Sequence, residues 1–584
     1  MKIRVNRNII WTEAFVDELA GLGVKYACIS PGSRNTPLTV AFAGHKQITP
    51  YLLVDERSSG FFALGLAKAS GSPIALICTS GTAAAEFYPA IIEAYQQHIP
   101  LIVCTADRPP ELQNRGANQT IHQDGIYKNH ICWSKNAGLP EVSRKKLNSV
   151  RKLAQTAFYK SSAHGPVHVN FPFRKPLEPF VFTDDVDELL LQKKNESIIP
   201  EKPDAPPVIN REMINEVFSL LQQKKRILIL SGPDEAAPDF PCTLQFLAAR
   251  LNLPILADGA SQLRNGSHSK QNIFVNFEGY LRSDSFSQTL QPEIILHFGK
   301  TMTSKGIEIF LEKTDAKYYL INKHGDLYDP HNKAHGVISM DPTVFCQEIL
   351  KLVSQNDFSP QDSTWLELFN RAETVAEELK SRLIYEAPFP FEGRIIKEVI
   401  SLMPENSNLM ISNSMPVRDL DYFSPAVARS ITVYNNRGAS GIDGIASTAL
   451  GIAAASGRPT VLLTGDLAFY YDMNGLLASA KYSIPLTIIL INNNGGGIFE
   501  MLPISGYDKL FNEYFITPLN LDFSHFVNGF GGFFRNITGW SDFHNSFAET
   551  FAKSNFSVLQ INTDSKKSAQ QRKAFWGQVS ASLT

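Results

Sequence analysis

Two stretches decide the expected fold: TVLLTGDL at residues 460–467 and LTIILINNNGG at residues 486–496. Each begins with an apolar run that predicts a buried strand, and the residues between them predict a helix, so the two strands are expected to be parallel neighbours. Asp466 and Asn493 then lie at one edge of the sheet, where open α/β sheets bind their ligands. The pattern therefore predicts a ligand site at that edge.

The oxygen atoms at this edge suit a hard divalent cation. Mg²⁺ takes about six oxygen ligands, usually one or two carboxylates with carbonyls, water and phosphate. Asp466, the amide of Asn493 and a main-chain carbonyl near Gly495 provide such a set. A Gly-Asp pair alone is more typical of an ordinary βαβ unit with a polar loop. The spaced asparagine run favours a site for a metal ion and a diphosphate.

Gly465-Asp466-Leu467 followed by Asn492-Asn493 resembles the signature of thiamine diphosphate enzymes. That family also requires a glutamate from another domain, which hydrogen-bonds the aminopyrimidine ring of the cofactor. YLLVDE at residues 51–56 offers Glu56 at the end of an apolar strand, and a helix rich in small residues is expected directly after it. By itself this acidic turn is typical of a solvated surface. Together with the downstream motif, it makes Glu56 the expected catalytic residue.

Length and composition restrict the class of protein. The chain has 584 residues, which predicts three or four domains, because single cores rarely exceed about 250–300 residues. Its 55 basic and 57 acidic residues give a formal net charge of −2, so we expect no nucleic-acid partner. No apolar run approaches the roughly 20 residues of a membrane span, and the N-terminus does not resemble a signal peptide. The six cysteines form no Cys-x-x-Cys pair, which favours reduced thiols in a cytoplasmic protein over a zinc or disulfide framework.

Strands and helices alternate along the chain, which predicts three doubly wound parallel-sheet α/β domains. We expect these at residues 1–182, 205–354 and 375–584, with a charged, proline-bearing linker at 183–207. The first and third look like two copies of one architecture. The middle unit resembles a Rossmann domain but has no Gly-x-Gly-x-x-Gly, so nicotinamide or flavin binding is not expected there. Strands are expected in the first unit at residues 25–30, 50–54, 74–79, 101–106 and 167–170, and in the middle unit at 226–230, 253–257, 294–298 and 318–321.

Polar clusters follow several of the predicted strands. Each one alone is typical of a turn or a surface loop. Together, consecutive main-chain amides and arginine side chains at strand ends predict a site for a ligand with several carboxylates. The clusters are SPGSRNTP at 30–37, ADRPP at 106–110 with RGANQT at 115–120, SNSMPVR at 412–418, and YNNRGASGIDG at 434–444.

The same clusters carry a narrower resemblance. SPGSR, DER, ADRPPEL, GANQ, NRGASGIDG, GDL and NNNGGGIF closely resemble the 2-succinyl-5-enolpyruvyl-6-hydroxy-3-cyclohexene-1-carboxylate synthases of the menaquinone pathway. The likeness is dense in the first and third units and faint in the middle one. It implies the thiamine diphosphate-binding fold, with thiamine diphosphate and Mg²⁺ or Mn²⁺ as cofactors. It also implies decarboxylation of 2-oxoglutarate, carbon–carbon bond formation with isochorismate, and a homodimer or homotetramer with the active site between subunits.

The resemblance also implies roles for individual residues. Asp466, Asn493 and Gly495 would bind the metal. The cofactor would be contacted by Glu56, Ser414, Ile442, Gly465, Asp466, Leu467, Asn493, Gly495, Gly496 and Ile498, with Ile442 as the apolar wedge that bends it. The substrates would be contacted by Ser33, Arg34, Arg108, Asn118, Gln119, Lys305, Arg418, Arg437 and Phe499.

Two other functions compete with this one. The first is a different thiamine diphosphate enzyme, either an acetolactate-synthase-like carboligase or a 2-oxo acid decarboxylase. The number of arginines near the predicted site argues against a small neutral acceptor. The second is a non-catalytic relative that binds a nucleotide or diphosphate as a regulator. The presence of Glu56, Asp466 and Asn493 together argues against this alternative, because a regulator has no use for a ring-activating glutamate.

Overall fold

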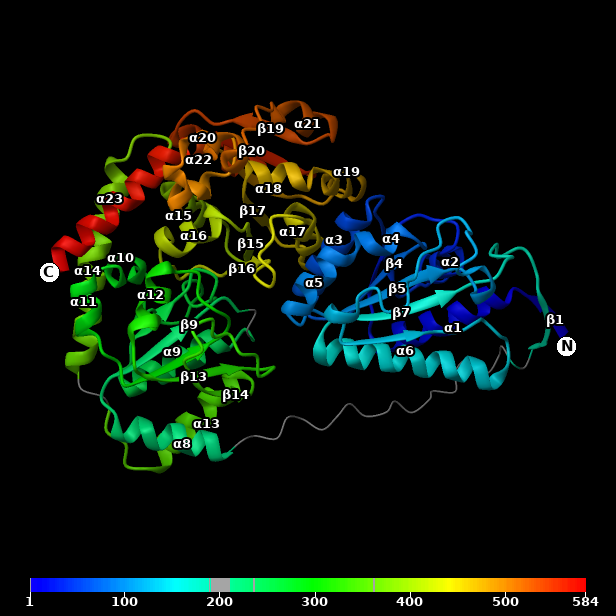
Figure 1. Ribbon diagram of the computed structural model, residues 1–584, viewed down its shortest axis with the longest axis horizontal. Coiled ribbons are helices and arrows are strands. Elements are labelled where there is room, and N and C mark those ends of the chain that lie inside the picture. Colours follow the sequence, from blue (N-terminus) through cyan, green and yellow to red (C-terminus); the bar gives the residue numbers. More distant parts are fainter. Residues whose placement is uncertain (1, 189, 191–210, 235–236, 361–362, 584) are drawn as a thin grey trace.

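The computed structural model describes residues 2–188, 190, 211–234, 237–360 and 363–583. Its described part contains three six-stranded sheets and one two-stranded sheet. Each large sheet is parallel throughout and forms its own lobe (Figure 1). The predicted α/β class with three parallel-sheet domains is confirmed. No described helix is both long enough and apolar enough to cross a bilayer.

The N-terminal sheet has the strand order β3-β2-β4-β5-β7-β6. Its strands are β2 (Tyr26–Ile29), β3 (Thr49–Leu52), β4 (Ile74–Cys78), β5 (Leu101–Asp107), β6 (Trp133–Asn136) and β7 (Val167–Pro172). Its helices are α1 (Arg7–Leu22), α2 (Thr36–Gly44), α3 (Glu56–Ser70), α4 (Thr82–Glu86), α5 (Tyr88–Gln96) and α6 (Arg144–His164). The five strands expected from sequence are all present. The edge strand β6, with the polar sequence WSKN, was not expected.

The predicted linker at 183–207 begins as a strand. β8 (Asp184–Asp187) pairs antiparallel with β1 (Lys2–Val5) and so joins the two ends of the N-terminal lobe. Arg7 reinforces this contact, because its Nε and Nη2 atoms donate to the Asp184 carboxylate, both at 2.9 Å. Residues 189 and 191–207 of the predicted linker lie outside the described residues.

The C-terminal sheet has the order β16-β15-β17-β18-β20-β19. Counted along the chain, this is the same order as in the N-terminal sheet, so the expectation of two copies of one architecture is confirmed. Its strands are β15 (Ser407–Ile411), β16 (Ile431–Asn435), β17 (Thr460–Gly465), β18 (Thr487–Asn492), β19 (Phe533–Asn536) and β20 (Ser557–Asn562). Its helices are α15 (Glu392–Leu402), α16 (Met415–Phe423), α17 (Ile445–Ser456), α18 (Asp466–Tyr471), α19 (Leu477–Tyr482), α20 (Asp508–Phe511), α21 (Phe523–Gly529), α22 (Trp540–Thr550) and α23 (Ser565–Leu583).

The middle sheet has the order β11-β10-β9-β12-β13-β14, which is the Rossmann order. Its strands are β9 (Ile227–Ser231), β10 (Ile255–Ala257), β11 (Ile273–Phe274), β12 (Ile294–Phe298), β13 (Lys317–Asn322) and β14 (Ala334–Ser339). Its helices are α8 (Arg211–Gln223), α9 (Phe240–Leu251), α10 (Phe277–Leu281), α11 (Asp284–Thr289), α12 (Lys305–Lys313), α13 (Pro342–Gln355) and α14 (Ser363–Glu386).

The C-terminal domain packs against the N-terminal domain through α3 and α17. A Cβ atom placed on Gly65 would lie 2.1 Å from the Thr448 carbonyl oxygen, and one on Gly451 would lie 2.1 Å from that of Phe62. Glycine is therefore required at both positions, because the two helices touch backbone to backbone. The apolar side chains around this crossing form one core that both domains share.

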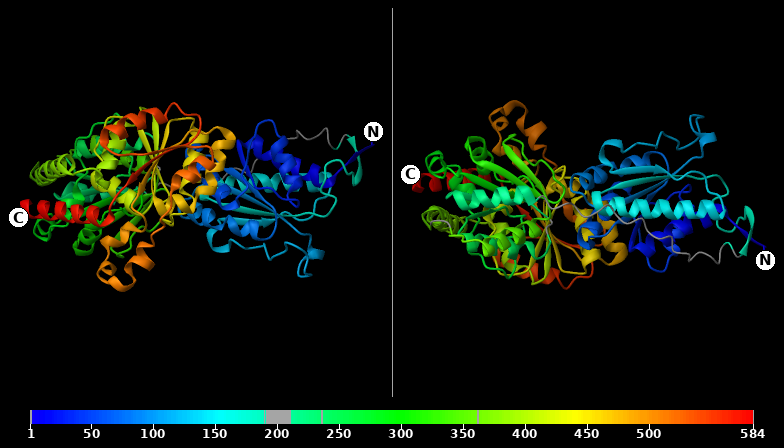
Figure 2. Two further views of the ribbon diagram at one scale, coloured as in Figure 1. Left: turned by 90° about the horizontal axis from the view of Figure 1, so that it is seen from above. Right: turned by 90° about the horizontal axis from the view of Figure 1, so that it is seen from below.

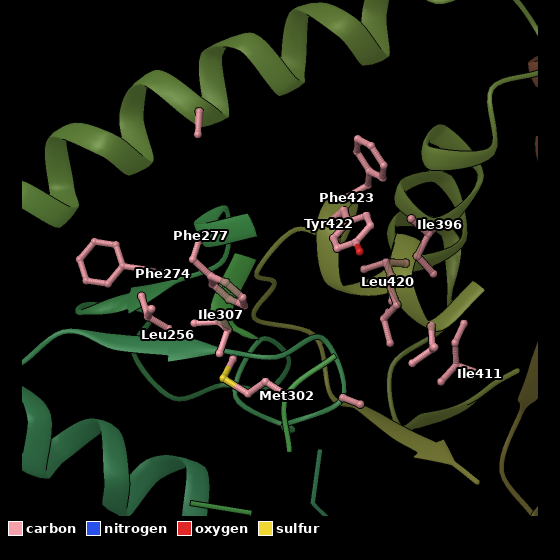
Figure 3. Packing of buried hydrophobic residues seen from close by; sticks show 14 of the residues in the cluster. Leu256, Phe274, Phe277, Met302, Ile307, Ile396, Ile411, Leu420, Tyr422 and Phe423 are labelled. Atoms are coloured by element: carbon pink, nitrogen blue, oxygen red, sulfur yellow. The ribbon is translucent and has the colours of Figure 1, made fainter. Parts of the chain in front are cut away.

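The middle and C-terminal domains share a second core. Figure 3 shows Leu256 and Phe277 of the middle domain on one side and Leu420 and Tyr422 of α16 on the other. The orthogonal views place the N-terminal lobe at one end of the molecule and these two lobes together at the other end (Figure 2). The C-terminal sheet thus has a neighbour on each side, and its strand ends remain available for a site.

Candidate functional site

A cavity of about 350 Å³ lies beyond the carboxyl ends of β15, β17 and β18. This is the edge where a parallel α/β sheet is expected to bind its ligand. The structure brings twelve of the sequence-predicted site residues together around it. They are Ser414, Arg418, Arg437, Ile442, Gly465, Asp466, Leu467, Asn493, Gly495, Gly496, Ile498 and Phe499.

Asp466 is the buried carboxylate of this cavity, with only 2% of its surface exposed. It is the first residue of α18, and its oxygen atoms accept hydrogen bonds from the backbone amides of Leu467 at 2.7 Å and Gly495 at 2.8 Å. Burial raises the pKa of Asp466 to about 6, although these N–H groups oppose the shift. A nearby cation would restore the charged form, because opposite charges lower a carboxyl pKa.

Asn493 has an amide whose orientation is fixed. Its Nδ2 donates to Glu392 Oε1 at 3.2 Å, so its Oδ1 is directed away from Glu392. That oxygen is buried and has no hydrogen-bond partner among the described residues. A buried, unpaired acceptor is costly, which indicates that a ligand normally satisfies it.

Glu392 is itself held by a buried ionic group. Its Oε2 accepts from Arg572 Nη2 at 2.7 Å, and Arg572 also contacts Asp419 at 2.5 Å. Glu392, Asp419 and Arg572 are 2%, 1% and 1% exposed, so one buried guanidinium is shared by two buried carboxylates. This network links the C-terminal helix α23 to the amide of Asn493.

These groups fit a hard divalent cation. Asp466 supplies a carboxylate and Asn493 an unpaired amide oxygen, and a carbonyl near Gly495 completes the predicted protein set. Within the described ranges no three His, Cys, Asp or Glu side chains gather as a metal site. A Mg²⁺ ion bound through one carboxylate and a diphosphate does not need such a cluster.

Two arginines line the same cavity. Arg418 Nη1 donates to the Ser414 carbonyl at 2.7 Å, and Arg437 Nη1 donates to Asn413 Oδ1 at 3.3 Å. Burial lowers the pKa of Arg437, but an arginine stays charged in proteins. Each guanidinium has five N–H donors, so both keep donors for a ligand carboxylate. Ser414 has a φ of 72°, a strained value for a serine and one typical of ligand sites.

Apolar side chains form another part of the wall. Ile442, Ile498, Phe499 and Met415 line the cavity beside the polar groups. Phe499 is fixed by an edge-to-face contact with Phe515, with ring centroids 5.4 Å apart. A wall that combines a few charges with apolar surface suits a ligand with a diphosphate and aromatic rings.

Three more of the predicted residues lie in the N-terminal domain, around a separate cavity of about 580 Å³. Arg34 and Arg108 line it with 8% and 9% exposure, and Asn118 is exposed at its edge. Arg34 donates to the Phe173 carbonyl at 2.9 Å, and Arg108 donates to the Ser80 hydroxyl. The predicted Ser33 and Gln119 are exposed and do not line either cavity.

Glu56 begins α3 and lines neither of these cavities. Its carboxyl group is partly buried, and burial raises its pKa, with Asp55 and Glu86 adding to the effect. The neighbouring Arg57 donates to the Tyr471 carbonyl at 2.7 Å and so fixes the start of α3 to the C-terminal domain. The predicted catalytic glutamate therefore lies at the start of a fixed helix, outside the Asp466 cavity of its own chain.

Lys305 is the one predicted site residue in the middle domain. It begins α12, its side chain is 51% exposed, and it pairs with Glu308 at 2.5 Å. It lines neither cavity within the single chain.

Sequence reasoning missed several residues of the site. Asn413 and Ser440 belong to the polar clusters at residues 412–418 and 434–444, but no role in the site was expected for either of them. Glu392 is far away in the sequence, and its signal is a charged residue on the buried face of the amphipathic helix α15. Each of the three lines the cavity around Asp466.

Comparison with known proteins identifies all three domains. Residues 11–126 match the family described as "Thiamine pyrophosphate enzyme, N-terminal TPP binding domain", and residues 424–561 match its "C-terminal TPP binding domain". Residues 209–411 match the family described as "Middle domain of thiamine pyrophosphate". Together the matches extend over the N-terminal, middle and C-terminal sheets.

Among solved structures, the fold is similar to a thiamine diphosphate-dependent 4-hydroxybenzoylformate decarboxylase of Rhodococcus jostii RHA1, with a TM-score of 0.68 and 16% identity. That match covers 95% of this chain and 99% of the other. A benzoylformate decarboxylase from Polynucleobacter necessarius gives a TM-score of 0.67, also at 16% identity, over 96% of this chain and 99% of the other. At this identity the similarity shows the fold alone.

Two curated relatives cover nearly the whole chain. It is 37% identical over 577 residues to the 2-succinyl-5-enolpyruvyl-6-hydroxy-3-cyclohexene-1-carboxylate synthase of Geobacillus kaustophilus, with 98% of each chain covered. It is 36% identical over 613 residues to the synthase of the same name from Haloquadratum walsbyi, again with 98% of each covered. The chain therefore belongs to the 2-succinyl-5-enolpyruvyl-6-hydroxy-3-cyclohexene-1-carboxylate synthase family of thiamine pyrophosphate enzymes.

Proposed function

We propose that the protein decarboxylates 2-oxoglutarate and adds the resulting four-carbon unit to isochorismate. The products are 2-succinyl-5-enolpyruvyl-6-hydroxy-3-cyclohexene-1-carboxylate and CO₂, as a step of menaquinone biosynthesis. One observation carries this proposal: the cavity that contains Asp466 and the unpaired Asn493 oxygen also contains Arg418 and Arg437. A diphosphate–metal site beside two arginines suits a cofactor reaction on substrates with several carboxylates.

Different residues of this cavity would bind different parts of the cofactor. Asp466, Asn493 Oδ1 and the Gly495 carbonyl would bind Mg²⁺ or Mn²⁺, and the backbone around Gly465, Leu467 and Gly496 would lie along the diphosphate. Ile442 and Ile498 would support the rings, and Ser414 would lie beside them. When bound, thiamine diphosphate supplies the group that stabilises the carbanion left by loss of CO₂.

The chain's own groups bind and orient the substrates. Arg418 and Arg437 would pair with substrate carboxylates, since an arginine fork binds a carboxylate with two parallel hydrogen bonds. Phe499 and the isoleucines keep water from the reacting carbon. Glu56 would share a proton with the pyrimidine ring, and burial, which raises its pKa, favours the protonated form that this role needs. Of these roles, only that of Glu56 moves a proton.

We place the complete site between two copies of the chain, in a homodimer or homotetramer. Glu56, Arg34 and Arg108 belong to the N-terminal domain and do not line the Asp466 cavity of their own chain. Large apolar side chains surround the start of α3, with Val54 62% and Leu477 45% exposed. An apolar surface of this kind is typical of a subunit contact. A second copy would bring its Glu56 to the metal-binding cavity.

Two sets of variants test this assembly. Glu56→Gln should lower turnover by about 10²–10⁴, the range for losing a positioned acid–base group, and Asp466→Ala should be inactive. Mixing the two inactive proteins under subunit exchange should restore part of the activity, because some mixed dimers contain one site with both native residues. No recovery, with exchange proven by mass spectrometry, would contradict a shared site.

A different thiamine diphosphate carboligase or 2-oxo acid decarboxylase is the alternative. The arginines of both cavities favour a dicarboxylic donor over pyruvate, which has no distal carboxylate. For the location of the protein we propose the cytoplasm, since six scattered cysteines without a Cys-x-x-Cys pair are typical of reduced thiols.

The decisive experiment combines the purified protein with thiamine diphosphate, Mg²⁺, 2-oxoglutarate and isochorismate, and identifies the product by its mass. Pyruvate in place of 2-oxoglutarate is the matched control for the distal carboxylate. We expect the 2-oxoglutarate reaction to be much faster. A preference for pyruvate, or no adduct with isochorismate, would overturn the assignment.

A further inference from the structure

The loop after β16 carries Arg437 and Ser440 to the Asp466 cavity, and a glutamate of the N-terminal domain holds its backbone. Glu93 Oε1 accepts from the amide of Gly438 at 2.8 Å, and its Oε2 accepts from the amide of Ala439 at 2.6 Å. The glutamate is 3% exposed. Both oxygens of one buried carboxylate thus fix two consecutive peptide groups, directly after Arg437.

Two further side chains of the N-terminal domain extend this contact. Gln97 Nε2 donates to Glu93 Oε1, and Gln97 Oε1 accepts from Lys68 Nζ at 2.7 Å. Lys68 Nζ also donates to the Asn435 carbonyl at 2.9 Å. A buried cation and a buried anion are therefore joined through one amide, and the pair holds the last residue of β16 and the middle of the loop.

The C-terminal domain holds the same loop from the opposite side. Asn413 Nδ2 donates to the carbonyls of Asn436 at 2.8 Å and Gly441 at 2.6 Å. A Cβ atom on Gly438 would lie 2.9 Å from the Glu93 carbonyl oxygen, so only glycine lets the loop approach α5 this closely. The position of Arg437 thus depends on contacts with both domains.

This arrangement goes beyond what packing alone requires. Burying a charge costs free energy that apolar side chains would not cost, and buried ionic groups are weak evidence for stability. The contact between the two domains is apolar around the crossing of α3 and α17. Other polar contacts join residues 52–58 of the N-terminal domain to residues 471–482 of the C-terminal domain. Figure 1 shows α3 and α5 on the side of the N-terminal lobe that faces α17. The charged groups are placed at the loop that lines the cavity.

We propose that Glu93, supported by Gln97 and Lys68, is a positioning residue that fixes the Arg437 loop for substrate binding. The inference rests on the proposed function for the role of Arg437 and adds a determinant outside the cavity. Glu93 does not line the Asp466 cavity, so it would act through the backbone of residues 437–439.

Glu93→Gln tests this proposal. The side-chain amide of Gln keeps one oxygen that can accept from a loop amide, but its NH₂ group is a donor and cannot accept from the other one. Glu373→Gln is the matched control. Glu373 also accepts from two consecutive backbone amides, those of Val275 at 2.8 Å and Asn276 at 3.1 Å, but it lies in the middle domain. Gln97→Ala, which keeps both charges, is a milder second variant for use if Glu93→Gln does not fold.

Two measurements separate a positioning role from a structural one. Amide hydrogen exchange at Gly438 and Ala439 should accelerate by about tenfold to a hundredfold in Glu93→Gln, the range for losing a hydrogen bond to a charged group. kcat/KM should fall by a similar factor, mainly through KM, because Arg437 binds substrate. Glu373→Gln should leave both quantities at their wild-type values.

The outcomes are distinguishable. Unchanged exchange at the loop, or equal losses of kcat/KM in Glu93→Gln and Glu373→Gln at equal losses of melting temperature, would overturn the inference. A wild-type protein that forms no product with isochorismate would overturn the proposed function instead, while the exchange measurement would still decide what Glu93 does.

Discussion

The cavity around Asp466 and the cavity around Arg108 differ in composition. The first combines a carboxylate, an amide, two arginines and an apolar wall. The second lies in the N-terminal domain and is lined by Arg34, Arg108 and Arg174, and its carboxylate, Glu111, is exposed and paired with Arg174 instead of buried. Yet the two sheets that carry them have the same strand order. Two sheets with the same strand order therefore carry different side chains at their corresponding edges.

This difference explains why two copies of one architecture are needed. In the proposed function, one domain would bind the metal and diphosphate, and the other would supply further cations and the carboxyl group of Glu56. The two cavities are separate within one chain. We therefore expect substitutions in one cavity to have different effects on binding from substitutions in the other. Cofactor binding should depend on the C-terminal cavity alone, and substrate binding on both.

The largest effect is expected for Asp466→Ala. Without this carboxylate the diphosphate and metal lose their main protein partner, so thiamine diphosphate and Mg²⁺ should no longer bind at concentrations that saturate the wild type. Isothermal calorimetry measures this directly, with Arg108→Ala as the control from the other cavity, whose cofactor binding should be unchanged. If Asp466→Ala bound the cofactor as well as the wild type and EDTA had no effect, the assignment of metal and cofactor binding to the C-terminal cavity would be wrong.

Smaller losses are expected from the arginines of either cavity. Deleting one partner of a buried charged contact costs about 2–5 kcal/mol, so Arg108→Ala and Arg437→Ala should each lower kcat/KM by roughly 30-fold to several thousand-fold. Steady-state kinetics with each substrate varied in turn will show which substrate each arginine binds. If either arginine variant also failed to bind the cofactor, the expected difference between cofactor binding by Asp466 and substrate binding by the arginines would be contradicted.

Glu392→Gln should have a moderate effect on metal affinity. The neutral amide no longer dictates which face of the Asn493 amide points to the metal, and losing such an outer contact typically costs about 10–100-fold in metal affinity. Asp419→Asn is the control, because Asp419 shares Arg572 but does not bond Asn493. Equal losses in both variants, measured by Mg²⁺ titration, would assign the effect to the buried charge alone.

The smallest effect is a pH dependence of the C-terminal cavity. Burial raises the pKa of Asp466 to about 6, so in the cofactor-free protein a proton competes with the metal below that pH. Metal affinity should therefore fall by about tenfold per pH unit below pH ~6, as expected for one competing proton.

The raised pKa of Asp466 affects folding stability in the opposite direction to metal affinity: low pH favours the folded state. Because the folded-state pKa exceeds the unfolded value of about 3.9, Asp466 contributes stability that is fully present below pH ~4 and is lost as the pH rises through about 6. Asp466→Asn should remove this part of the pH dependence of the melting temperature of the cofactor-free protein. An identical pH profile for the variant would contradict the raised pKa.

Much of this site could be predicted because its residues follow apolar strands. β17 and β18 are fully buried runs that end at Gly465 and Asn492, so their polar continuations had to lie at one sheet edge. The same reasoning identified Arg418 and Arg437 next to β15 and β16. Local sequence indicates such strands because a buried strand of a parallel sheet requires a continuous apolar run.

The remainder depends on contacts between segments far apart in the sequence. Glu392 reaches Asn493 only because the first residue of α15 lies next to the loop after β18. Glu93 reaches Gly438 only because two domains meet. Sequence places Arg34 and Arg437 in similar clusters, but it does not show that the N-terminal arginines surround a cavity of their own. The short strand β8 was likewise hidden, because its sequence DDVD has no apolar run and its partner β1 is at the other end of the lobe.

The crossing of α3 and α17 has a consequence for how the polypeptide can be divided. Its two glycines set the spacing of the N- and C-terminal domains by direct backbone contact, so the peptide connection between residues 190 and 211 is not needed to align them. Two separately encoded pieces, ending at 190 and beginning at 211, would retain this contact surface intact. Co-expression should therefore yield a complementing pair of fragments, whereas alanine at Gly65 should prevent their association even though each piece keeps its own sheet.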